Sequence, residues 1–83
     1  SQLIAYPNPS DGKITVAFNL MKRLSNVRLE IKDILGRIIA EKNFESALSE
    51  NLEFDLKDQK HGVYFISLIT EEGTETSKVI LNR

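Results

Sequence analysis

Residues 61–69 read HGVYFISLI and form the most continuously apolar stretch of the chain. Val, Tyr, Phe and Ile side chains suit a pleated, buried surface, so this composition favours a β-strand. The stretch is short and has Gly62 near its start, which argues against a buried helix. A strand that is apolar on both faces belongs inside a sheet or beneath a second layer. We therefore expect residues 61–69 to form the central strand, with Tyr64, Ile66 and Leu68 facing inward.

Six other segments carry strand patterns. Residues 13–20 (KITVAFNL) and 27–32 (VRLEIK) alternate cleanly between apolar and polar side chains, as a strand with one buried face does. The remaining strand segments are residues 3–6, 38–44, 51–56 and 74–81. Turn signals recur about every eight to twelve residues, a spacing typical of immunoglobulin-like folds. The pattern therefore predicts an all-β fold, specifically a seven-stranded antiparallel β-sandwich of immunoglobulin-like architecture.

The segments between the predicted strands are polar or rich in Pro and Gly. Residues 21–26 and 45–50 are predicted connections, and the second is long enough to cross from one sheet to the other. Residues 33–37 form a turn in which Gly36 supplies a positive φ. Residues 6–12 (YPNPSDG) contain two prolines that lack an N–H group, so this segment runs along a sheet edge.

The alternation also predicts which side chains interdigitate between the two sheets. These are Phe18, Leu29, Ile31, Phe54, Tyr64, Ile66 and Ile80. The apolar side chains of Val63, Phe65 and Ile69 then point away from the core, because successive residues of a strand face opposite sides. Either another segment covers them, or they form an apolar patch beside the last strand that a partner uses.

Length and composition limit the possible classes of protein. The chain has 83 residues, a net charge of −1, 41% hydrophobic and 28% charged residues, and no Cys. We interpret residues 1–83 as one domain, and as a fragment of a longer protein because the chain opens in the middle of a strand pattern. The lack of Cys excludes disulfides and thiolate metal sites. Charges of both signs are scattered, without a basic stripe for nucleic acid, and no apolar run is long enough for membrane insertion.

Side chains suited to catalysis are few. The single histidine, His61, lacks a supporting motif although Asp58 is near it in sequence, so a solvent-exposed loop histidine is the simpler interpretation. One His without Cys does not supply a zinc ligand set. Asp11, Asp33, Asp55 and Asp58 lie at strand ends, where carboxylates are usually turn residues, and a surface calcium site stays open. We predict no enzyme and no cofactor, and we assign no residue to a metal site.

Four segments spread over the whole chain match the motifs of one protein family. They are Tyr6-Pro7-Asn8-Pro9 followed by Asp11-Gly12, the block of residues 27–37 in which an alternating strand runs into the turn with Asp33, Gly36 and Arg37, the strand start Gly62-Val63-Tyr64-Phe65, and the ending Lys78-Val79-Ile80-Leu81-Asn82-Arg83. In this order and spacing the sequence resembles the C-terminal sorting domain of type IX secretion, also called the Por secretion tail, type A. Each motif is short, but the four together are specific. The one departure is Arg83, where many members carry Lys, and the positive charge is retained.

The resemblance implies a non-catalytic secretion signal. In the family, such domains end proteins of Gram-negative bacteria that first reach the periplasm by a separate N-terminal signal. The outer-membrane translocon recognises the domain and exports the covalently linked N-terminal cargo, which is then secreted or held on the cell surface. In many members a sortase-like peptidase removes the domain, and the corresponding cut here would lie near Ser1 and Gln2.

Recognition requires an exposed surface, and the last predicted strand is the candidate. The residues assigned to partner recognition are Lys78, Val79, Ile80, Leu81 and Arg83, together with Gly62 and Tyr64. At a sheet edge, the unpaired N–H and C=O groups of this strand would accept a strand from the receptor, while Lys78 and Arg83 steer docking. Alternatively, Val79 or Ile80 completes the core and the two charges protect the edge against aggregation. An open edge also allows a weak edge-strand dimer beside the monomer.

A second functional class is an immunoglobulin-like or fibronectin-like accessory module that binds carbohydrate or spaces domains. This hypothesis predicts an exposed aromatic platform. The aromatic residues of the chain are Tyr6, Phe18, Phe44, Phe54, Tyr64 and Phe65. Most of them occupy inward positions of the strand pattern, which favours the secretion signal.

Overall fold

The protein is built almost entirely from antiparallel β-strands. The computed structural model describes residues 2–82. Its strands are β1 (Gln2–Tyr6), β2 (Lys13–Lys32), β3 (Ile38–Asp55), β4 (Gly62–Thr70) and β5 (Gly73–Leu81). They form an elongated body of 37 × 22 × 16 Å. Within residues 2–82 no helix has the length and hydropathy that a membrane span requires. The predicted all-β class is confirmed, but the structure has five strands where the pattern predicted seven.

The long strands β2 and β3 account for the difference in strand number. Each runs through two of the predicted strands, so residues 21–26 and 45–50 belong to strands and are not connections. A register shift between Asn19 and Leu24 interrupts their pairing, and shifts of this kind bend a strand. Leu24 and Ala47 are buried on the inner side of the bend. The polar residues that suggested loops lie on its outer side, where they face water.

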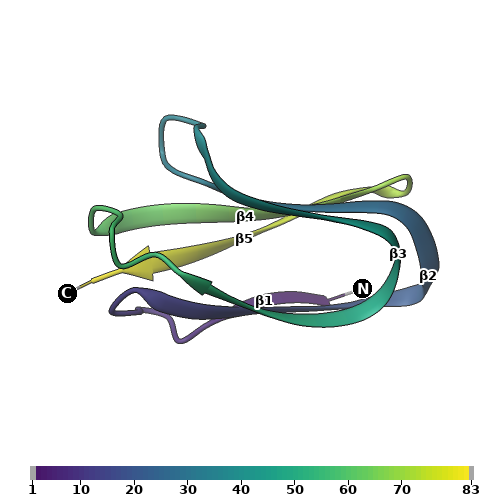
Figure 1. Ribbon diagram of the computed structural model, residues 1–83, viewed down its shortest axis with the longest axis horizontal. Coiled ribbons are helices and arrows are strands. Elements are labelled where there is room, and N and C mark those ends of the chain that lie inside the picture. The colour runs from purple at the N-terminus through teal and green to yellow at the C-terminus, as the bar shows by residue number, and fades with distance from the viewer. Residues whose placement is uncertain (1, 83) are drawn as a thin grey trace.

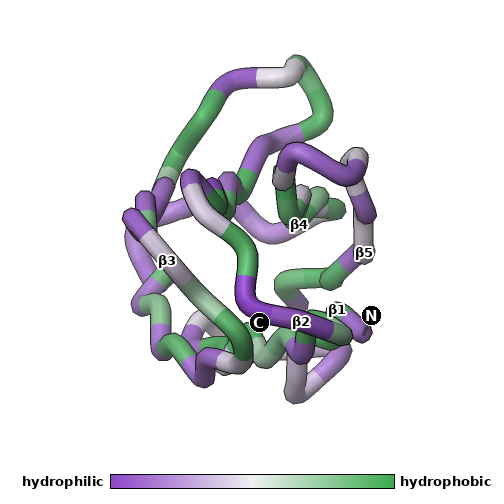
Figure 2. Tube along the Cα trace, turned by 90° about the vertical axis from the view of Figure 1, so that its right-hand side faces the viewer, coloured by the Kyte–Doolittle hydropathy of each residue, from purple (hydrophilic) through white to green (hydrophobic). Residues whose placement is uncertain are grey.

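The bent hairpin of β2 and β3 folds the sheet into two facing layers (Figure 1). The first half of β2 pairs with β1 and with the second half of β3 in one layer. The second half of β2 pairs with the first half of β3 and with β4 in the other layer, where β5 follows β4. Viewed along the long axis, β3 lies on one side of the molecule, and β1 and β5 lie on the other (Figure 2). The result is one curled sheet, so the immunoglobulin-like arrangement of two separate sheets is not confirmed.

The central strand is β2, and the prediction that residues 61–69 would be central was wrong. β2 pairs with β1, β3 and β4, whereas β4 lies between β2 and β5. β4 is nevertheless an interior strand of its layer, which agrees with its apolar composition. β2 has more neighbouring strands than β4 but fewer apolar residues for its length. Its polar residues are tolerated because its outer face is open to water over much of its length.

The core lies between the two layers. Its most deeply buried side chains are Val16, Val27, Leu29, Ile31, Ile66, Leu68, Val79 and Leu81. The predicted core residues found buried are Phe18, Leu29, Ile31, Tyr64 and Ile66. Phe54 packs against the core while remaining partly exposed. The assignment of Ile80 to the core was wrong: Val79 pairs with the buried Tyr64 and faces inward, so Ile80 faces outward and is 36% exposed.

Candidate functional site

The four segments that resemble family motifs converge on one end of the molecule, which we call the motif end. It comprises the turns at residues 7–12 and 33–37, the loop at residues 56–61 with the start of β4, and the end of β5. In Figure 1 this end lies on the left, and the N-terminus and the bends of β2 and β3 lie on the right. We call the opposite end, with the bends and the turn between β4 and β5, the bend end. Motifs far apart in the sequence therefore form one surface.

The first motif is attached to the last strand through Asn8. The side-chain oxygen of Asn8 accepts a hydrogen bond from the backbone N–H of Ile80 at 3.0 Å. Its side-chain nitrogen donates to the carbonyl of Lys78 at 3.1 Å. One amide side chain thus takes both roles that a neighbouring strand would take. Both prolyl peptide bonds of this segment, at Pro7 and Pro9, are cis.

Ser10 continues the attachment with its backbone. Its N–H donates to the carbonyl of Ile80 and its carbonyl accepts from the N–H of Asn82, both at 2.8 Å. The buried hydroxyl of Ser10 donates to the carbonyl of Lys13 and accepts from the N–H of Gly12. The prediction that residues 6–12 run along a sheet edge is confirmed, and that edge belongs to β5.

Gly12 joins the same turn to the loop before β4. Its carbonyl accepts a hydrogen bond from the N–H of Leu56 at 2.7 Å. Its φ of +139° is a conformation that side-chain-bearing residues avoid, and a Cβ atom there would lie 2.9 Å from Cγ of Lys57. Glycine is therefore required both for the backbone conformation and for the close approach of the two segments.

The second motif forms a turn that the Asp33 side chain holds closed. One carboxylate oxygen accepts from the N–H groups of Leu35 and Arg37, each at 2.9 Å, and the other accepts from Nε of Arg37 at 2.7 Å. The backbone of Asp33 also bonds to Arg37 and Gly36. Partial burial tends to raise the pKa of Asp33, but the donors from Arg37 and Leu35 outweigh it, so the pKa lies below its ordinary value. Gly36 has a φ of +84°, which confirms its predicted role.

The third motif orders the loop that faces this turn. The Tyr64 hydroxyl donates to the carbonyl of Lys60 at 2.5 Å, so a buried ring fixes the loop to the strand that follows it. Between this loop and the turn at residues 33–37 lies a hollow of about 430 Å³. The hollow is lined by apolar side chains, including Leu35 and Val63, and by charged ones, including Lys60. His61 is exposed on its rim, where the sequence predicted a loop histidine.

The structure divides the predicted recognition residues into two groups. Val79, Leu81 and Tyr64 are buried, so their side chains hold β5 and β4 on the core. Lys78 and Ile80 are exposed on the outer face of β5. Gly62 begins β4, directly opposite Leu81. The predicted site at Arg83 lies outside the described residues.

The edge of the last strand is only partly open. Within residues 2–82, β4 is the one strand that pairs with β5. The last strand therefore lies at an edge of the sheet, as expected from the sequence. Near its end, however, the outward groups of Lys78, Ile80 and Asn82 already bond to residues 8–10. Because backbone groups alternate between the two sides of a strand, the outward groups that these bonds leave are those of Thr74 and Thr76 and the N–H of Lys78. Strand addition from a receptor can therefore use only the part of β5 nearest the bend end.

Sequence reasoning missed the most exposed apolar residues of the motif end. Ile34 and Leu35 are 71% and 74% exposed at the tip of the turn held by Asp33. A signal was present, since turns are usually made of Gly, Pro, Asn, Asp and Ser, and two large aliphatic residues are unusual there. Of the outward residues of β4, Phe65 is 37% exposed, which supports the expected apolar patch beside the last strand.

A charged network covers the outer face of β2 beside this patch. Glu30 is buried and accepts a hydrogen bond from Nε of Arg28 at 2.5 Å, and Nζ of Lys32 lies 3.3 Å from its other oxygen. Arg28 also contacts Glu41 of β3 at 2.6 Å. The hydrogen bond from Arg28 lowers the pKa of Glu30, burial opposes it, and Lys32 lowers it further. The network ties β2 to β3, and it gives the buried carboxylate of Glu30 two positively charged partners.

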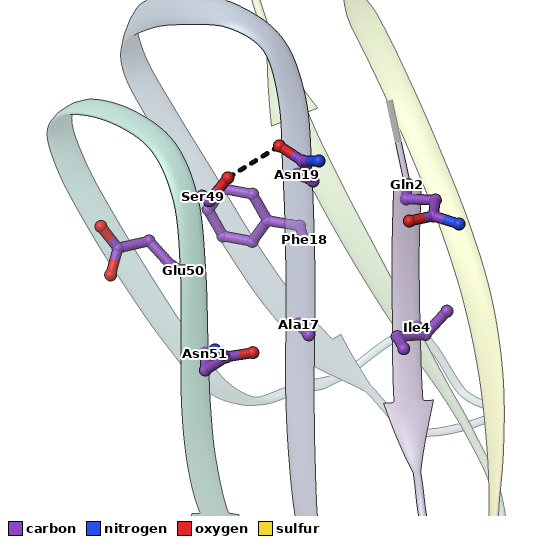
Figure 3. A pocket seen from close by; sticks show the side chains of 8 residues that line it. All are labelled: Gln2, Ile4, Ala17, Phe18, Asn19, Ser49, Glu50 and Asn51. Atoms are coloured by element: carbon purple, nitrogen blue, oxygen red, sulfur yellow. Dashed lines mark hydrogen bonds between the residues drawn. The ribbon is translucent and has the colours of Figure 1, made fainter.

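The opposite layer carries a second hollow, away from the motif residues. Its volume is about 500 Å³, and Ala17 and Ile4 contribute apolar surface to it (Figure 3). Amide and hydroxyl side chains surround them, and the hydroxyl of Ser49 donates to Asn19 at 2.7 Å. Phe18 lines the hollow but is 3% exposed, so the hollow lacks the exposed aromatic ring that the carbohydrate-binding hypothesis requires.

No arrangement for chemistry accompanies these surfaces within residues 2–82. No group of three or more His, Asp or Glu side chains in that range is placed to hold a metal ion. Asp11, Asp33, Asp55 and Asp58 are distributed over different turns, with Asp33 bonded to Arg37 and Asp55 paired with Lys57.

A small all-β domain with one elaborated end is typical of a recognition module. Comparison with known proteins makes the class specific: the family model described as "Secretion system C-terminal sorting domain" matches residues 4–82. The chain therefore belongs to the family of type IX secretion C-terminal sorting domains. Domains of this family direct export across the outer membrane to the cell surface or the medium. No curated protein matches the chain.

Proposed function

We propose that the secretion machinery reads this domain at its motif end while the domain is folded. A covalently linked cargo precedes β1, passes through the periplasm with the domain and leaves through the outer-membrane translocon. The domain contributes recognition and no catalysis. The sorting role of the family is thus placed at the motif end, where named side chains contact the secretion machinery.

The observation that supports the proposal most directly is the attachment of the first motif to the last strand. Residues 8–10 make four hydrogen bonds to Lys78, Ile80 and Asn82, across about seventy residues of sequence. Separate sequence motifs are thus assembled only in the folded domain. A receptor that reads this surface distinguishes a folded cargo tail from an unfolded one.

Within this surface, Lys78 and Ile80 are the residues of β5 that a receptor contacts directly. Val79, Leu81 and Tyr64 act indirectly, because they are buried and hold the strands that present the exposed residues. Arg83 adds a positive charge next to this surface in the sequence. Such charges increase the rate of encounter with an acidic receptor more than they increase affinity.

A sortase-like peptidase removes the domain from surface-attached cargo in this scheme, with the cut at or before β1, near Ser1 and Gln2. Gln2 lies at the bend end, and a cut there leaves the hydrogen bonds of the motif end intact. Because the cut and the recognition surface lie at opposite ends of the domain, the peptidase and the translocon can bind the same domain.

The test is export of a periplasmic reporter fused to this domain in a host with the type IX pathway. Deletion of residues 78–83 is unsuitable, because it removes the buried Val79 and Leu81 and unfolds the domain. The informative variants are Lys78→Glu and Ile80→Thr, which alter exposed side chains and leave the core unchanged.

Lys42→Glu and Leu48→Thr are the matched controls, since Lys42 is an exposed lysine of β3 and Leu48 is 37% exposed at the bend end. We expect secretion of the wild-type and control fusions and reduced secretion of the Lys78→Glu and Ile80→Thr fusions. Equal secretion of all four variants would assign recognition to another part of the domain. Retention of the wild-type fusion in the periplasm would refute the sorting role of this chain.

A further inference from the structure

The turn between β2 and β3 presents its apolar side chains to solvent on a rigid frame. Ile34 and Leu35 are 71% and 74% exposed, although the surrounding turn uses the carboxylate of Asp33 and the backbone of Gly36 to close itself. The turn stands away from the body of the molecule in both views (Figure 1, Figure 2). Two exposed aliphatic side chains on an ordered turn have little conformational freedom to lose on binding.

A second apolar area lies beside this turn on the outer face of β4 and β5. Val63 pairs with Ile80, and Phe65 pairs with Lys78, so these side chains share one face. Val63 also lines the hollow that contains Ile34 and Leu35. The turn tip and the strand face are therefore parts of one surface, which we call the apolar corner: Ile34, Leu35, Val63, Phe65 and Ile80.

The charges of the molecule are distributed unevenly around the apolar corner. Lys60 lines the hollow, Lys78 lies next to Phe65, and neither has an ion pair among residues 2–82. The carboxylates of the same hollow are Asp33, which is bonded to Arg37, and Asp58. Glutamates gather at the bend end instead. They are Glu45, Glu50, Glu71, Glu72 and Glu75, beside the cations Lys22 and Arg23.

From these observations we infer that the apolar corner docks a protein segment that carries apolar side chains flanked by carboxylates. The inference rests on the proposed function and narrows it to one surface and one kind of partner, an acidic apolar segment of the secretion machinery. The apolar side chains of the segment pack against Ile34, Leu35 and Val63 in the hollow. Its carboxylates meet Lys60 and Lys78, and the glutamates of the bend end are repelled by the same partner, which orients the domain.

The shape of the surface favours a protein segment over a lipid surface. A hollow of about 430 Å³ separates the loop before β4 from the turn that carries Ile34 and Leu35, so the apolar corner is concave where Ile34, Leu35 and Val63 line this hollow. A flat bilayer surface that touches the tip of the turn does not fill this hollow. A side chain of a protein segment does fill it, and filling a concave apolar site excludes water from the contact.

The experiment uses the reporter fusion with the double substitution Ile34→Asn and Leu35→Asn. Asparagine is common in turns, so the turn keeps its hydrogen bonds while the tip loses its apolar surface. Met21→Asn with Leu48→Asn is the matched control, because both residues are exposed apolar residues of the bend end. We expect the tip variant to lower the secreted fraction by about tenfold or more and the control to secrete normally.

A photo-crosslinking residue at position 35 or position 48 of the same fusion identifies the partner class. A crosslink from position 35 to an outer-membrane protein, absent from position 48 and abolished by Lys78→Glu, supports the inference. Sedimentation of the domain with vesicles of phosphatidylglycerol and phosphatidylethanolamine, lost in the tip variant and without a protein crosslink, would overturn it in favour of lipid. Normal secretion of the tip variant would also overturn it. Failure of the wild-type fusion to be secreted would instead refute the proposed function.

Discussion

The motif end and the bend end are made from the same sheet but are stabilised in different ways. At the motif end, the side chain of Asn8 joins the first turn to β5, while the side chains of Ser10 and Asp33 hold their own turns closed. At the bend end, β2 and β3 pass from one layer to the other as continuous strands, with Leu24 and Ala47 buried inside the bend. An end assembled from turns requires particular polar residues, whereas a bend in paired strands requires little more than inward apolar residues.

This difference has a consequence for function. The polar side chains of the motif end leave two large aliphatic residues, Ile34 and Leu35, on the surface, and such residues reduce solubility unless a partner covers them. The bend end exposes Met21 in a strand, beside a hollow whose lining also includes Glu72 and Glu75. Substitutions at matched positions of the two ends therefore separate recognition from stability.

The largest expected effect on stability comes from Leu81→Ala at the motif end. Leu81 is 1% exposed at the end of β5, so its truncation leaves a cavity and costs about 2–5 kcal/mol of unfolding free energy. Leu48→Ala at the bend end removes the same atoms from a side chain that is 37% exposed, and we expect a loss of less than about 1 kcal/mol. Urea denaturation of both variants measures the difference. Equal losses would show that β5 does not complete the core.

The next largest effect is expected for Asn8→Ala. It removes the partner of the N–H of Ile80 and of the carbonyl of Lys78. Because both bonds are exposed, water takes the place of the asparagine in part, and the loss should be about 0.5–1.5 kcal/mol. Asn8→Asp keeps the acceptor for the N–H of Ile80 but sets a carboxylate oxygen against the carbonyl oxygen of Lys78, so its loss should be no smaller than that of Asn8→Ala. Asn51→Ala, at an exposed position of β3, is the control. Thermal unfolding gives the order of the variants.

Asn8→Ala also tests whether residues 8–10 protect the edge of β5. Without the asparagine, part of that edge is free to pair with a second copy. Sedimentation velocity at several concentrations should show a monomer for the wild-type domain and self-association for the variant. A variant that stays monomeric at all concentrations would show that Ser10 alone covers the edge.

A smaller effect is expected from acid, through Glu30 and Asp33. The pKa of each carboxyl is lowered in the folded state, by Arg28 at Glu30 and, despite partial burial, by Arg37 and Leu35 at Asp33. A lowered folded-state pKa gives stability that is present above the unfolded-state pKa, about 4, and is lost as the pH falls through the folded-state value. The unfolding free energy should therefore decrease below about pH 5.

Glu30→Gln separates the contribution of Glu30 from that of other carboxyls. The variant should be less stable than wild type near pH 7 by under about 1 kcal/mol, because water and salt screen the partners Arg28 and Lys32, whose side chains are 37% and 36% exposed, and the difference should shrink in acid. Glu53→Gln, which replaces an exposed glutamate of β3, is the matched control. If the unfolding free energy of Glu30→Gln changed with pH in parallel with that of wild type, Glu30 would not contribute to the pH dependence.

The smallest effect on stability is expected from the substitutions that should affect secretion most. Ile34→Asn with Leu35→Asn alters side chains that are already exposed, so the unfolding free energy should change by no more than about 0.5 kcal/mol. Met21→Asn with Leu48→Asn should lose somewhat more, about 1 kcal/mol, because Leu48 is only 37% exposed. A large loss of stability in the tip variant would mean that misfolding causes its secretion defect. The two variants would then not show that the motif end is recognised and the bend end is not.

Several features were predictable from the sequence because each depends on neighbours along the chain. Apolar alternation predicted the all-β class and the inward face of β4, and both are confirmed. The need for a positive φ predicted Gly36 in its turn, and the missing N–H groups of Pro7 and Pro9 predicted an edge position for residues 6–12. The four short motifs, in order, predicted the family that the comparison confirms.

Other features depend on contacts between distant parts of the chain, and only the tertiary structure decides them. Polar residues on the outer side of a bent strand have the composition of a loop, so the continuity of β2 and β3 had no local signal. The inward position of Val79 in place of Ile80 follows from the register with β4. The motif end exists because Asn8 bonds to Ile80, and a hydrogen bond between residues 72 positions apart leaves no pattern in the sequence between them.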